Sequence, residues 1–181
     1  KHSTTLVSED AQSAVLKRAL DATIYYVTIS WEGTAKLSEK SANYFVLTPT
    51  DSVFTFTCQF TPQASAAPIL TFAEVQQASS GHWQNYWTQG AVADFSQCTD
   101  VRAKELERRV VLSQYLLAIQ CAGSTPPQET GLTYNSWFGK FHLEMIWWHQ
   151  AQFALWGHPE LLDHTLSWYE TVEPVTYTHL T

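Results

Sequence analysis

One carboxylate stands within the most aromatic stretch of this chain. Glu144 belongs to the sequence KFHLEMIWWHQAQFALW, which runs from Lys140 to Trp156 and is almost wholly apolar. An ionised carboxylate in such surroundings is costly unless it is paired, protonated or engaged in chemistry. Glu144 is therefore our candidate catalytic residue.

The side chains near Glu144 in the sequence suit a polyhydroxyl ligand such as a sugar. Tryptophan rings offer flat faces, and amide, imidazole and ammonium groups offer hydrogen bonds to hydroxyl groups. Several of them lie on the loop PQETGLTYNSW, at 127–137, and loops held by rigid elements often carry sites. The candidate substrate-binding residues are Gln128, Glu129, Asn135, Trp137, Lys140, His142, Trp148 and His149.

Three roles are open for Glu144. A glycosidase needs a carboxylic acid that protonates the leaving oxygen, and an apolar, tryptophan-lined pocket favours the protonated form. An ionised Glu144 would instead accept hydrogen bonds from sugar hydroxyl groups. The third role is a structural ion pair with Lys140 or a protonated histidine. The loop before Glu144 is also open to two interpretations. Glu129 can bind the substrate there, or it can be an ordinary surface acid on a solvated loop.

The spacing of His142 and His149 opposes a zinc site. A zinc-binding H-E-x-x-H helix places its two histidines four residues apart on one face. His142 and His149 are seven residues apart, which is roughly 10 Å along a helix axis. We therefore predict no metal. The chain also contains no glycine-rich phosphate loop and no G-x-S-x-G motif, and we predict no cofactor.

The elements before residue 70 are predicted to be strands. Alternation of apolar and polar residues predicts strands over 22–31, 43–48 and 52–60. The last strand is predicted to place one apolar set on a single face: Phe54, Phe56, Cys58 and Phe60. Three short strands need a partner sheet, which favours part of an antiparallel β-sandwich domain over residues 1–61.

Beyond the strands the apolar period becomes helical. The sequence PQASAAP begins a region of linker and short helices, which we place at 62–95. Residues 100–123 predict an amphipathic helix with one side in water. Its predicted buried stripe is Val101, Leu106, Val110, Leu117 and Cys121.

The stretch from Lys140 to Trp156 predicts a helix buried on nearly every side, because apolar residues surround it. Gly157 is expected to end it, and another amphipathic helix is expected to start at Pro159. Outer and inner helices in alternation favour the first hairpins of an α/α toroid over residues 96–181. The predicted fold class is thus α+β multidomain, with the end of a β-sandwich, a linker and the start of a toroid.

Composition excludes several classes of function. The formal charge of −7, with its basic cluster interleaved with glutamates, argues against a nucleic-acid partner. No run of about 18 apolar residues occurs, so no membrane span is predicted. Cys58 and Cys121 are predicted to be buried free thiols. Few Lys and many Ser, Thr, Gln and Trp residues favour a secreted protein.

Several motifs together resemble one family. They are W-x-x-Y-W from Trp83, L-E-R-R from Leu106, and the block G-L-x-x-N-x-W-x-G-K-F-H-L-E-M-x-W-W-H from Gly131. The chain resembles the six-hairpin glycosidase superfamily, and within it the maltose and trehalose phosphorylases and the acid trehalase-like glycoside hydrolases.

The resemblance implies a β-sandwich before an α/α toroid, an oligosaccharide or glycoside substrate, and glycosidic bond hydrolysis with inversion, in which water enters between two carboxylates. In the family, a Trp-Asp-x-Glu block on an early inner helix binds the sugar beside the scissile bond. The comparable residues here are His142, Leu143 and Glu144, so the resemblance implies that Glu144 binds substrate.

The resemblance also implies that the general acid belongs to the remainder of the same enzyme. The chain starts at Lys1 without an initiator Met, and we expect it to be a fragment. The alternative is a non-catalytic carbohydrate-binding or protein-interaction module, whose aromatic residues form a sugar platform.

Overall fold

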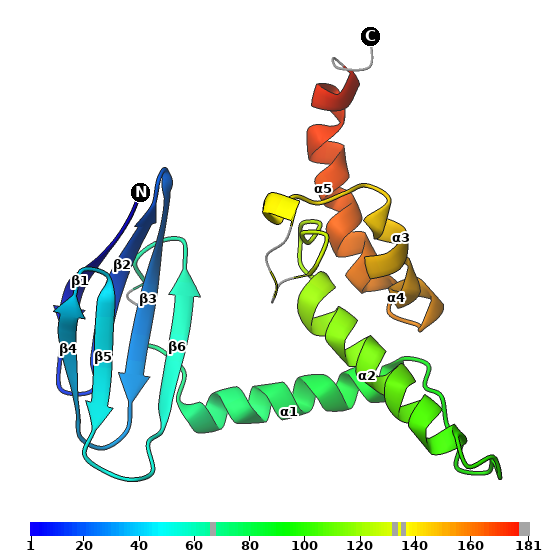
Figure 1. Cartoon of the computed structure of the whole chain (residues 1–181), viewed down its shortest axis with the longest axis horizontal. Helices are drawn as coiled ribbons and strands as arrows, with labels where there is room; N and C mark the ends of the chain where they lie inside the picture. Colours follow the sequence, from blue (N-terminus) through cyan, green and yellow to red (C-terminus); the bar gives the residue numbers. More distant parts are fainter. Residues whose placement is uncertain (66–67, 132–133, 135–136, 178–181) are drawn as a thin grey trace. The chain divides into compact units, whose positions relative to one another are not determined.

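The computed structural model describes residues 1–65, 68–131, 134 and 137–177. It is a mixed α+β structure, in which the strands precede the helices along the chain (Figure 1). The chain divides into two compact units, Lys1–His82 and Trp83–Thr181. We call the first the β unit and the second the helical unit. The assignment of 1–61 to a sandwich and 96–181 to a toroid stays a prediction.

A four-stranded antiparallel sheet makes up most of the β unit. Its strands are β1 (His2–Glu9), β2 (Ser13–Leu20), β3 (Thr23–Trp31) and β6 (Phe56–Thr61), in the order β1-β2-β3-β6. The strands β4 (Ala35–Ser41) and β5 (Tyr44–Pro49) pair in a second antiparallel sheet. The strands β3, β5 and β6 confirm the three predicted ones. The strands β1, β2 and β4 were not predicted, because charged and hydroxyl side chains interrupt their apolar alternation.

The two sheets share one apolar cluster. Ala14 of β2, Trp31 of β3 and Leu37 of β4 are all buried. Phe45 and Leu47 of β5 pack against them. Because side chains alternate between the faces of a strand, the pairing register keeps this apolar set on one side of the four-stranded sheet.

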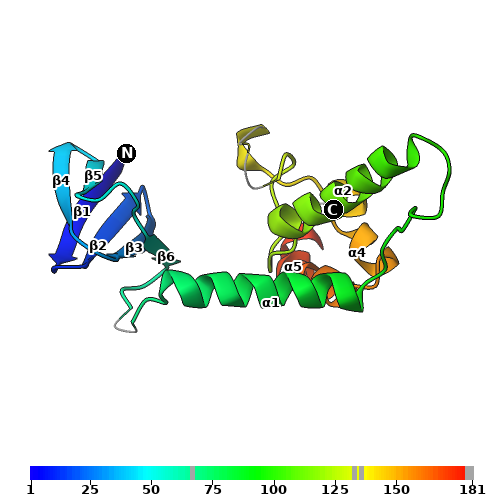
Figure 2. The same ribbon diagram turned by 90° about the horizontal axis from the view of Figure 1, so that it is seen from below.

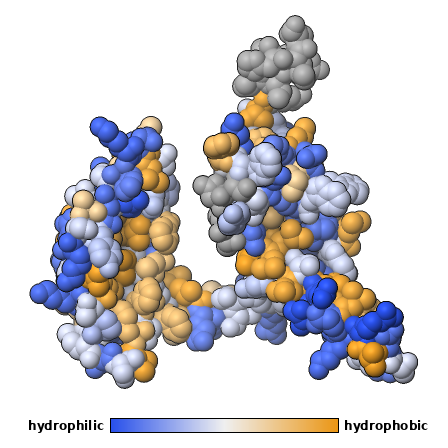
Figure 3. All heavy atoms as spheres, viewed as in Figure 1, coloured by the Kyte–Doolittle hydropathy of each residue, from blue (hydrophilic) through white to orange (hydrophobic). Residues whose placement is uncertain are grey.

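The apolar side chains of the edge strand β6 lie on the same face of the sheet as Trp31 and Ile29, but they are not covered. Phe56 is 51% and Phe60 is 67% exposed, and Cys58 is exposed as well, whereas Thr57 is half-buried. The reason is coverage, since the apolar cluster centres on β2, β3 and β4 and reaches only Phe54 next to this strand. Hydrophobic atoms are accordingly visible on the surface of the β unit (Figure 3).

The helical unit contains the end of one long helix and several further helices. They are α1 (Phe72–Gln89), α2 (Ala103–Cys121), the 3-10 turn η1 (Trp137–Gly139), α3 (Met145–His149), α4 (Ala151–Leu155) and α5 (Pro159–Tyr177). The helices α2, α4 and α5 gather at the C-terminal end of α1 (Figure 2). Helix α1 is continuous over 18 residues, in a region where a linker and short helices were expected.

Helix α2 confirms the amphipathic helix predicted over 100–123. Its sequence is rich in Leu, Ala, Glu, Gln and Arg, which are strong helix formers. Glu105 accepts hydrogen bonds from Arg108 and Arg109, and these lower the pKa of Glu105 to about 2. All three side chains are exposed, so the pairs add little to stability.

The predicted buried stripe of α2 is confirmed only near its C-terminus. Cys121 is 2% exposed, and burial raises its pKa to about 11. At the other end, Val101 is 95% and Leu106 is 52% exposed, so these two assignments are wrong.

The continuous buried helix predicted from Lys140 to Trp156 is wrong. Residues 140–144 are not helical, and α3 and α4 are separated at Gln150, whose φ is −129°. Trp147 and Trp148 are 67% and 66% exposed. Aromatic residues and histidine are weaker helix formers than the residues of α2, which explains why apolar character alone did not produce one helix. The predicted end at Gly157, with φ of +84°, and the predicted start of α5 at Pro159 are confirmed.

The end of α1 packs tightly against the turn before α5. The ring of Tyr86 stacks on that of buried His158, with centroids 4.1 Å apart and an angle of 9° between the ring planes. The Ala91 N–H donates to the Trp156 carbonyl at 2.7 Å. A Cβ atom on Gly90 would lie 2.2 Å from Nε2 of His158, so a side chain at this position requires a shift.

Two further findings concern membrane spans and thiols. Within the described part of the chain, no helix has the length and apolar character needed to cross a membrane. Cys58, Cys98 and Cys121 are free thiols. Burial of Cys121 confirms one prediction, and exposure of Cys58 contradicts the other.

Candidate functional site

The loop between α2 and η1 is braced by hydrogen bonds that fix the position of Glu129. The Glu129 N–H donates to the Lys140 carbonyl at 3.0 Å, and this bond closes the loop. The Gln128 side-chain amide donates to the Tyr134 carbonyl at 3.2 Å. Gly131 has a φ of +77°, and a Cβ atom there would lie 2.2 Å from Oε1 of Gln120, so the turn requires glycine.

Glu129 contacts His142 inside this frame. Oε2 of Glu129 lies 3.3 Å from Nε2 of His142, and their side chains are 24% and 44% exposed. The ring of Trp137 stands edge-on to that of His142, with centroids 6.2 Å apart. Trp137 is 61% exposed. A carboxylate, an imidazole and an open indole face therefore lie together at the surface.

His149 supports Glu129 from the buried side. His149 is 8% exposed, and burial lowers its pKa below the ordinary histidine value. A hydrogen bond to the backbone of Glu129 and the charge of Glu129 act in the opposite direction with smaller effect. A neutral His149 can therefore hold the Glu129 backbone, while the Glu129 carboxylate faces His142.

The carboxylate of Glu129 keeps hydrogen-bonding capacity. Its Oε2 atom is buried and makes no hydrogen bond within the described residues, although His142 is close. A carboxylate has about four lone-pair positions, and this side chain retains exposed surface. Because Oε2 is buried against His142, a ligand hydroxyl group can reach only the exposed part of this side chain.

The structure brings together four of the predicted site residues: Glu129, Trp137, His142 and His149. Gln128 adjoins them, and Lys140 joins through its backbone carbonyl. The prediction that these residues lie in one region is distinct from the prediction that they bind substrate. Their substrate-binding roles stay predictions. Asn135 lies outside the described residues.

Glu144 and Trp148 have no recorded contact with Glu129 among the described residues. Glu144 is exposed, which contradicts the predicted buried carboxylate, and it directly precedes α3. Among the residues that the structure describes, no hydrogen bond, ion pair or ring contact joins Glu144 or Trp148 to Glu129. The reason is the start of α3 at Met145, which removes the helical face that Lys140, Glu144 and Trp148 were predicted to share.

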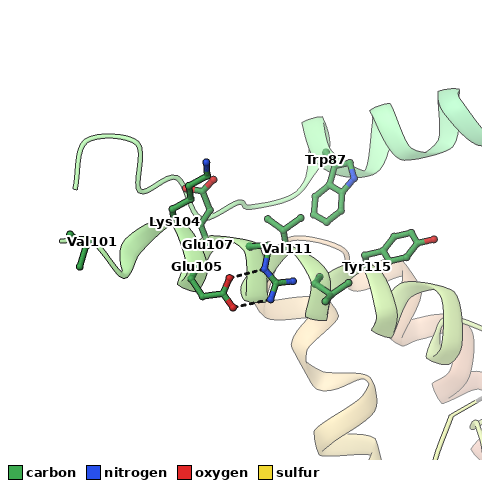
Figure 4. Close-up of a pocket in the computed structure, with 9 residues that line it drawn as sticks. Trp87, Val101, Lys104, Glu105, Glu107, Val111 and Tyr115 are labelled. Carbon is green, nitrogen blue, oxygen red and sulfur yellow. Dashed lines mark hydrogen bonds and ion pairs between the residues drawn. The ribbon is translucent and has the colours of Figure 1, made fainter. Parts of the chain in front are cut away.

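A separate groove lies between α1 and α2. It has a volume of about 800 Å³, and Trp87, Val111 and Tyr115 line its apolar part (Figure 4). At its other end Glu105 is paired with Arg108, and Glu107 accepts a hydrogen bond from the Phe95 N–H at 2.7 Å. Its carboxylates therefore already have partners in the chain. We assign the candidate site to Glu129 instead.

The described residues contain no group of three or more His, Cys, Asp or Glu side chains that could hold a metal ion. Comparison with protein-family models, curated proteins and solved structures finds no match to this chain.

Proposed function

We propose that this chain is part of a secreted glycoside hydrolase of the six-hairpin type. In this proposal the strands belong to an antiparallel β-sandwich and the helices to the first hairpins of an α/α toroid. The order of strands before helices supports it. Its partners are an oligosaccharide or glycoside substrate and the remainder of the same enzyme. The family assignment in this proposal rests on the resemblance of the Gly131–His149 block. The location of the site rests on the contacts of Glu129 with its neighbours.

The observation that carries the site is the contact of Glu129 with His142 beside the open face of Trp137. Sugar rings present apolar C–H faces and a rim of hydroxyl groups, so an indole face next to a hydrogen-bond acceptor matches both. Glu129 accepts from a hydroxyl group, and His142 exchanges hydrogen bonds with the same ligand. Glu144 stays our candidate for the second carboxylate that contacts the sugar.

The reaction in this proposal is hydrolysis with inversion. It requires two carboxyl groups about 6.5–9.5 Å apart, so that water fits between them. We assign Glu129 and Glu144 to substrate binding, and place the general acid in the remainder of the enzyme.

The test compares variants of the full-length protein with maltose and trehalose as substrates. Glu129→Gln keeps the shape of the side chain and removes its charge. We expect it to lower kcat/KM at least tenfold, or about 1.4 kcal/mol, because a charge-assisted hydrogen bond to the sugar is lost. Glu170→Gln is the matched control, since Glu170 is an exposed residue of α5. NMR of the first product identifies the anomer that is released.

Three outcomes separate the alternatives. Equal loss in Glu129→Gln and Glu144→Gln would show that both carboxylates contact the substrate. An unchanged kcat/KM in Glu129→Gln would remove Glu129 from the site. Binding of maltose or trehalose without any turnover by the full-length protein would favour the non-catalytic carbohydrate-binding module, which the exposed rings of Trp147 and Trp148 could also serve.

A further inference from the structure

A pocket lies at the C-terminal end of α2, next to the Glu129 loop. Its volume of about 510 Å³ falls within the range of about 300–1,000 Å³ that small-molecule sites occupy. The described residues that line it are Ala118, Ile119, Gln120, Ala122, Gly123, Thr125, Pro126, Pro127, Gln128 and Gly139. Sequence reasoning had identified only Gln128 among them.

The lining of this pocket is polar but uncharged. Its described side chains include no Asp, Glu, Lys, Arg or His. Gln120 and Gln128 supply amides, Thr125 supplies a hydroxyl group, and Pro126 and Pro127 supply apolar surface. Each amide has both donor and acceptor atoms. Such a lining suits a ligand with several hydroxyl groups and no net charge.

The end of α2 adds a preference for hydrogen-bond donors. Ala118, Ile119 and Gln120 belong to the last turn of this helix, whose final carbonyls have no partner within the helix. The aligned peptide dipoles also place partial negative charge there. Negative potential at this end of the helix favours ligand hydroxyl groups and opposes an anion. A carboxylated or phosphorylated sugar is therefore disfavoured at this position.

Neighbouring elements hold the walls of the pocket. The Gln150 amide donates to the Cys121 carbonyl at 3.3 Å, and the Thr165 hydroxyl donates to the Gly123 carbonyl at 2.8 Å. Gln128 is held by its bond to the Tyr134 carbonyl. A pocket whose walls are fixed before binding loses less entropy when it takes up a ligand.

We propose that this pocket binds one uncharged sugar ring, as a second subsite beside Glu129. Gln128 lines the pocket, and the next residue, Glu129, contacts His142. Adjacent Cα atoms are about 3.8 Å apart, so a single oligosaccharide can reach both places. That the ligand is a sugar rests on the proposed function, whereas its lack of charge follows from the pocket lining.

The test fills the pocket with a bulky side chain in the full chain. Thr125→Trp places an indole at the pocket wall, and Ser124→Trp is the matched control, because Ser124 is an exposed neighbour outside the lining. The probes are D-glucose, D-galactose, D-mannose and D-glucuronate, titrated by ligand-detected NMR. Circular dichroism of each variant establishes that it is folded.

We expect at least one neutral hexose to bind, and Thr125→Trp to weaken it at least about tenfold. Ser124→Trp should keep the affinity of the unmodified chain, and D-glucuronate should bind about tenfold more weakly than the best neutral hexose. Binding that Thr125→Trp does not change, equal or tighter binding of D-glucuronate, or no binding of any neutral hexose would each overturn the proposal.

Hexose binding by the pocket and hydrolysis by the enzyme can be measured separately. Loss of hexose binding in Thr125→Trp, with no turnover of maltose or trehalose by the full-length protein, would support the pocket and reject the hydrolase. Turnover that depends on Glu129 but not on Thr125 would support the hydrolase and reject the pocket.

Discussion

Among the described residues, the buried side chains of the β unit are all apolar, whereas the helical unit buries polar side chains as well as apolar ones. The buried cluster of the β unit is apolar and is built on Trp31 and Leu37. In the helical unit, Gln150 is 1% and Thr165 is 0% exposed. An apolar cluster is stabilised in proportion to the area that it removes from water, whereas buried polar groups depend on individual hydrogen bonds. We therefore expect the β unit to respond to lost volume, and the helical unit to changes of single atoms.

The buried polar groups of the helical unit form one network. The Gln150 amide donates to the Thr165 hydroxyl at 2.8 Å and to the Cys121 carbonyl at 3.3 Å. The Thr165 hydroxyl donates in turn to the Gly123 carbonyl at 2.8 Å. The network thus joins the end of α2, the break between α3 and α4, and α5. Its loss would loosen the elements that hold both the pocket and Glu129.

The largest expected effect is the loss of volume in the β unit. Trp31→Ala removes the largest side chain of the apolar cluster, and we expect a destabilisation of about 3–5 kcal/mol. The control is Phe56→Ala, because Phe56 pairs with Trp31 across the sheet but is half exposed. We expect it to cost about 1 kcal/mol. Hydrogen exchange of peptides from the β unit measures both. Equal effects would show that the cluster does not stabilise this unit.

A single added carbon atom tests the tight packing of the helical unit. Gly90→Ala places a Cβ atom 2.2 Å from Nε2 of buried His158, and we expect a cost of about 2–3 kcal/mol. Gly81→Ala is the matched control, since nothing lies within 4 Å of its Cβ position in α1. It should be stabilising by about 0.5–1 kcal/mol, because alanine favours a helix. Urea denaturation gives both values, and a neutral Gly90→Ala would mean that His158 moves aside freely.

Replacement of one oxygen atom tests the polar network. Thr165→Val keeps the shape of the side chain but removes the partner of Gln150 and Gly123. We expect a cost of about 1–2 kcal/mol, because buried polar groups lose their hydrogen bonds. Thr171→Val, on the exposed surface of the same helix, should change the unfolding free energy by less than about 0.5 kcal/mol. If both variants unfold at the same urea concentration, the network contributes no stability.

The regular elements could be predicted where the local pattern shows which face is buried. The alternation around Trp31 identified β3, and the three- and four-residue spacing of apolar residues identified α2. The burial of β6 and of residues 140–156 could not be predicted, because it depends on which other elements cover them. Phe60 and Trp147 are apolar by type, yet both are largely exposed. Local sequence contains no information about that coverage.

The sequence singled out the loop that folds around Glu129, but it predicted Glu144 to be the buried carboxylate, and Glu144 is exposed. Trp-rich surroundings made Glu144 the candidate, and the structure places the two histidines beside Glu129 instead. That arrangement depends on the bond between the Glu129 N–H and the Lys140 carbonyl, which folds the loop back on itself. A backbone contact of this kind leaves no signal in side-chain spacing. The neighbouring pocket was missed for a similar reason, since it forms only where the loop folds back beside the end of α2.

The smallest expected effect concerns the charge of one buried polar residue in the helical unit. Burial lowers the pKa of His149, so the unfolded chain binds its proton more readily than the folded chain. His149 thus contributes stability that is fully present above the ordinary histidine pKa of about 6.5 and is lost as pH falls through the lowered value. We expect the urea concentration at the unfolding midpoint to decrease as the pH is lowered from 7.5 to 5.5.

The dependence of the urea midpoint on pH can be compared between a variant of His149 and a variant of an exposed histidine. His149→Gln keeps a donor for the Glu129 backbone but cannot titrate, so its urea midpoint should depend less on pH. His164→Gln is the control, because His164 is an exposed residue of α5. If His164→Gln flattens the pH dependence as much as His149→Gln does, then burial of His149 is not its cause. In that case the buried polar groups of the helical unit would contribute to stability through hydrogen bonds alone. The protonation of His149 would then not distinguish this unit from the apolar β unit.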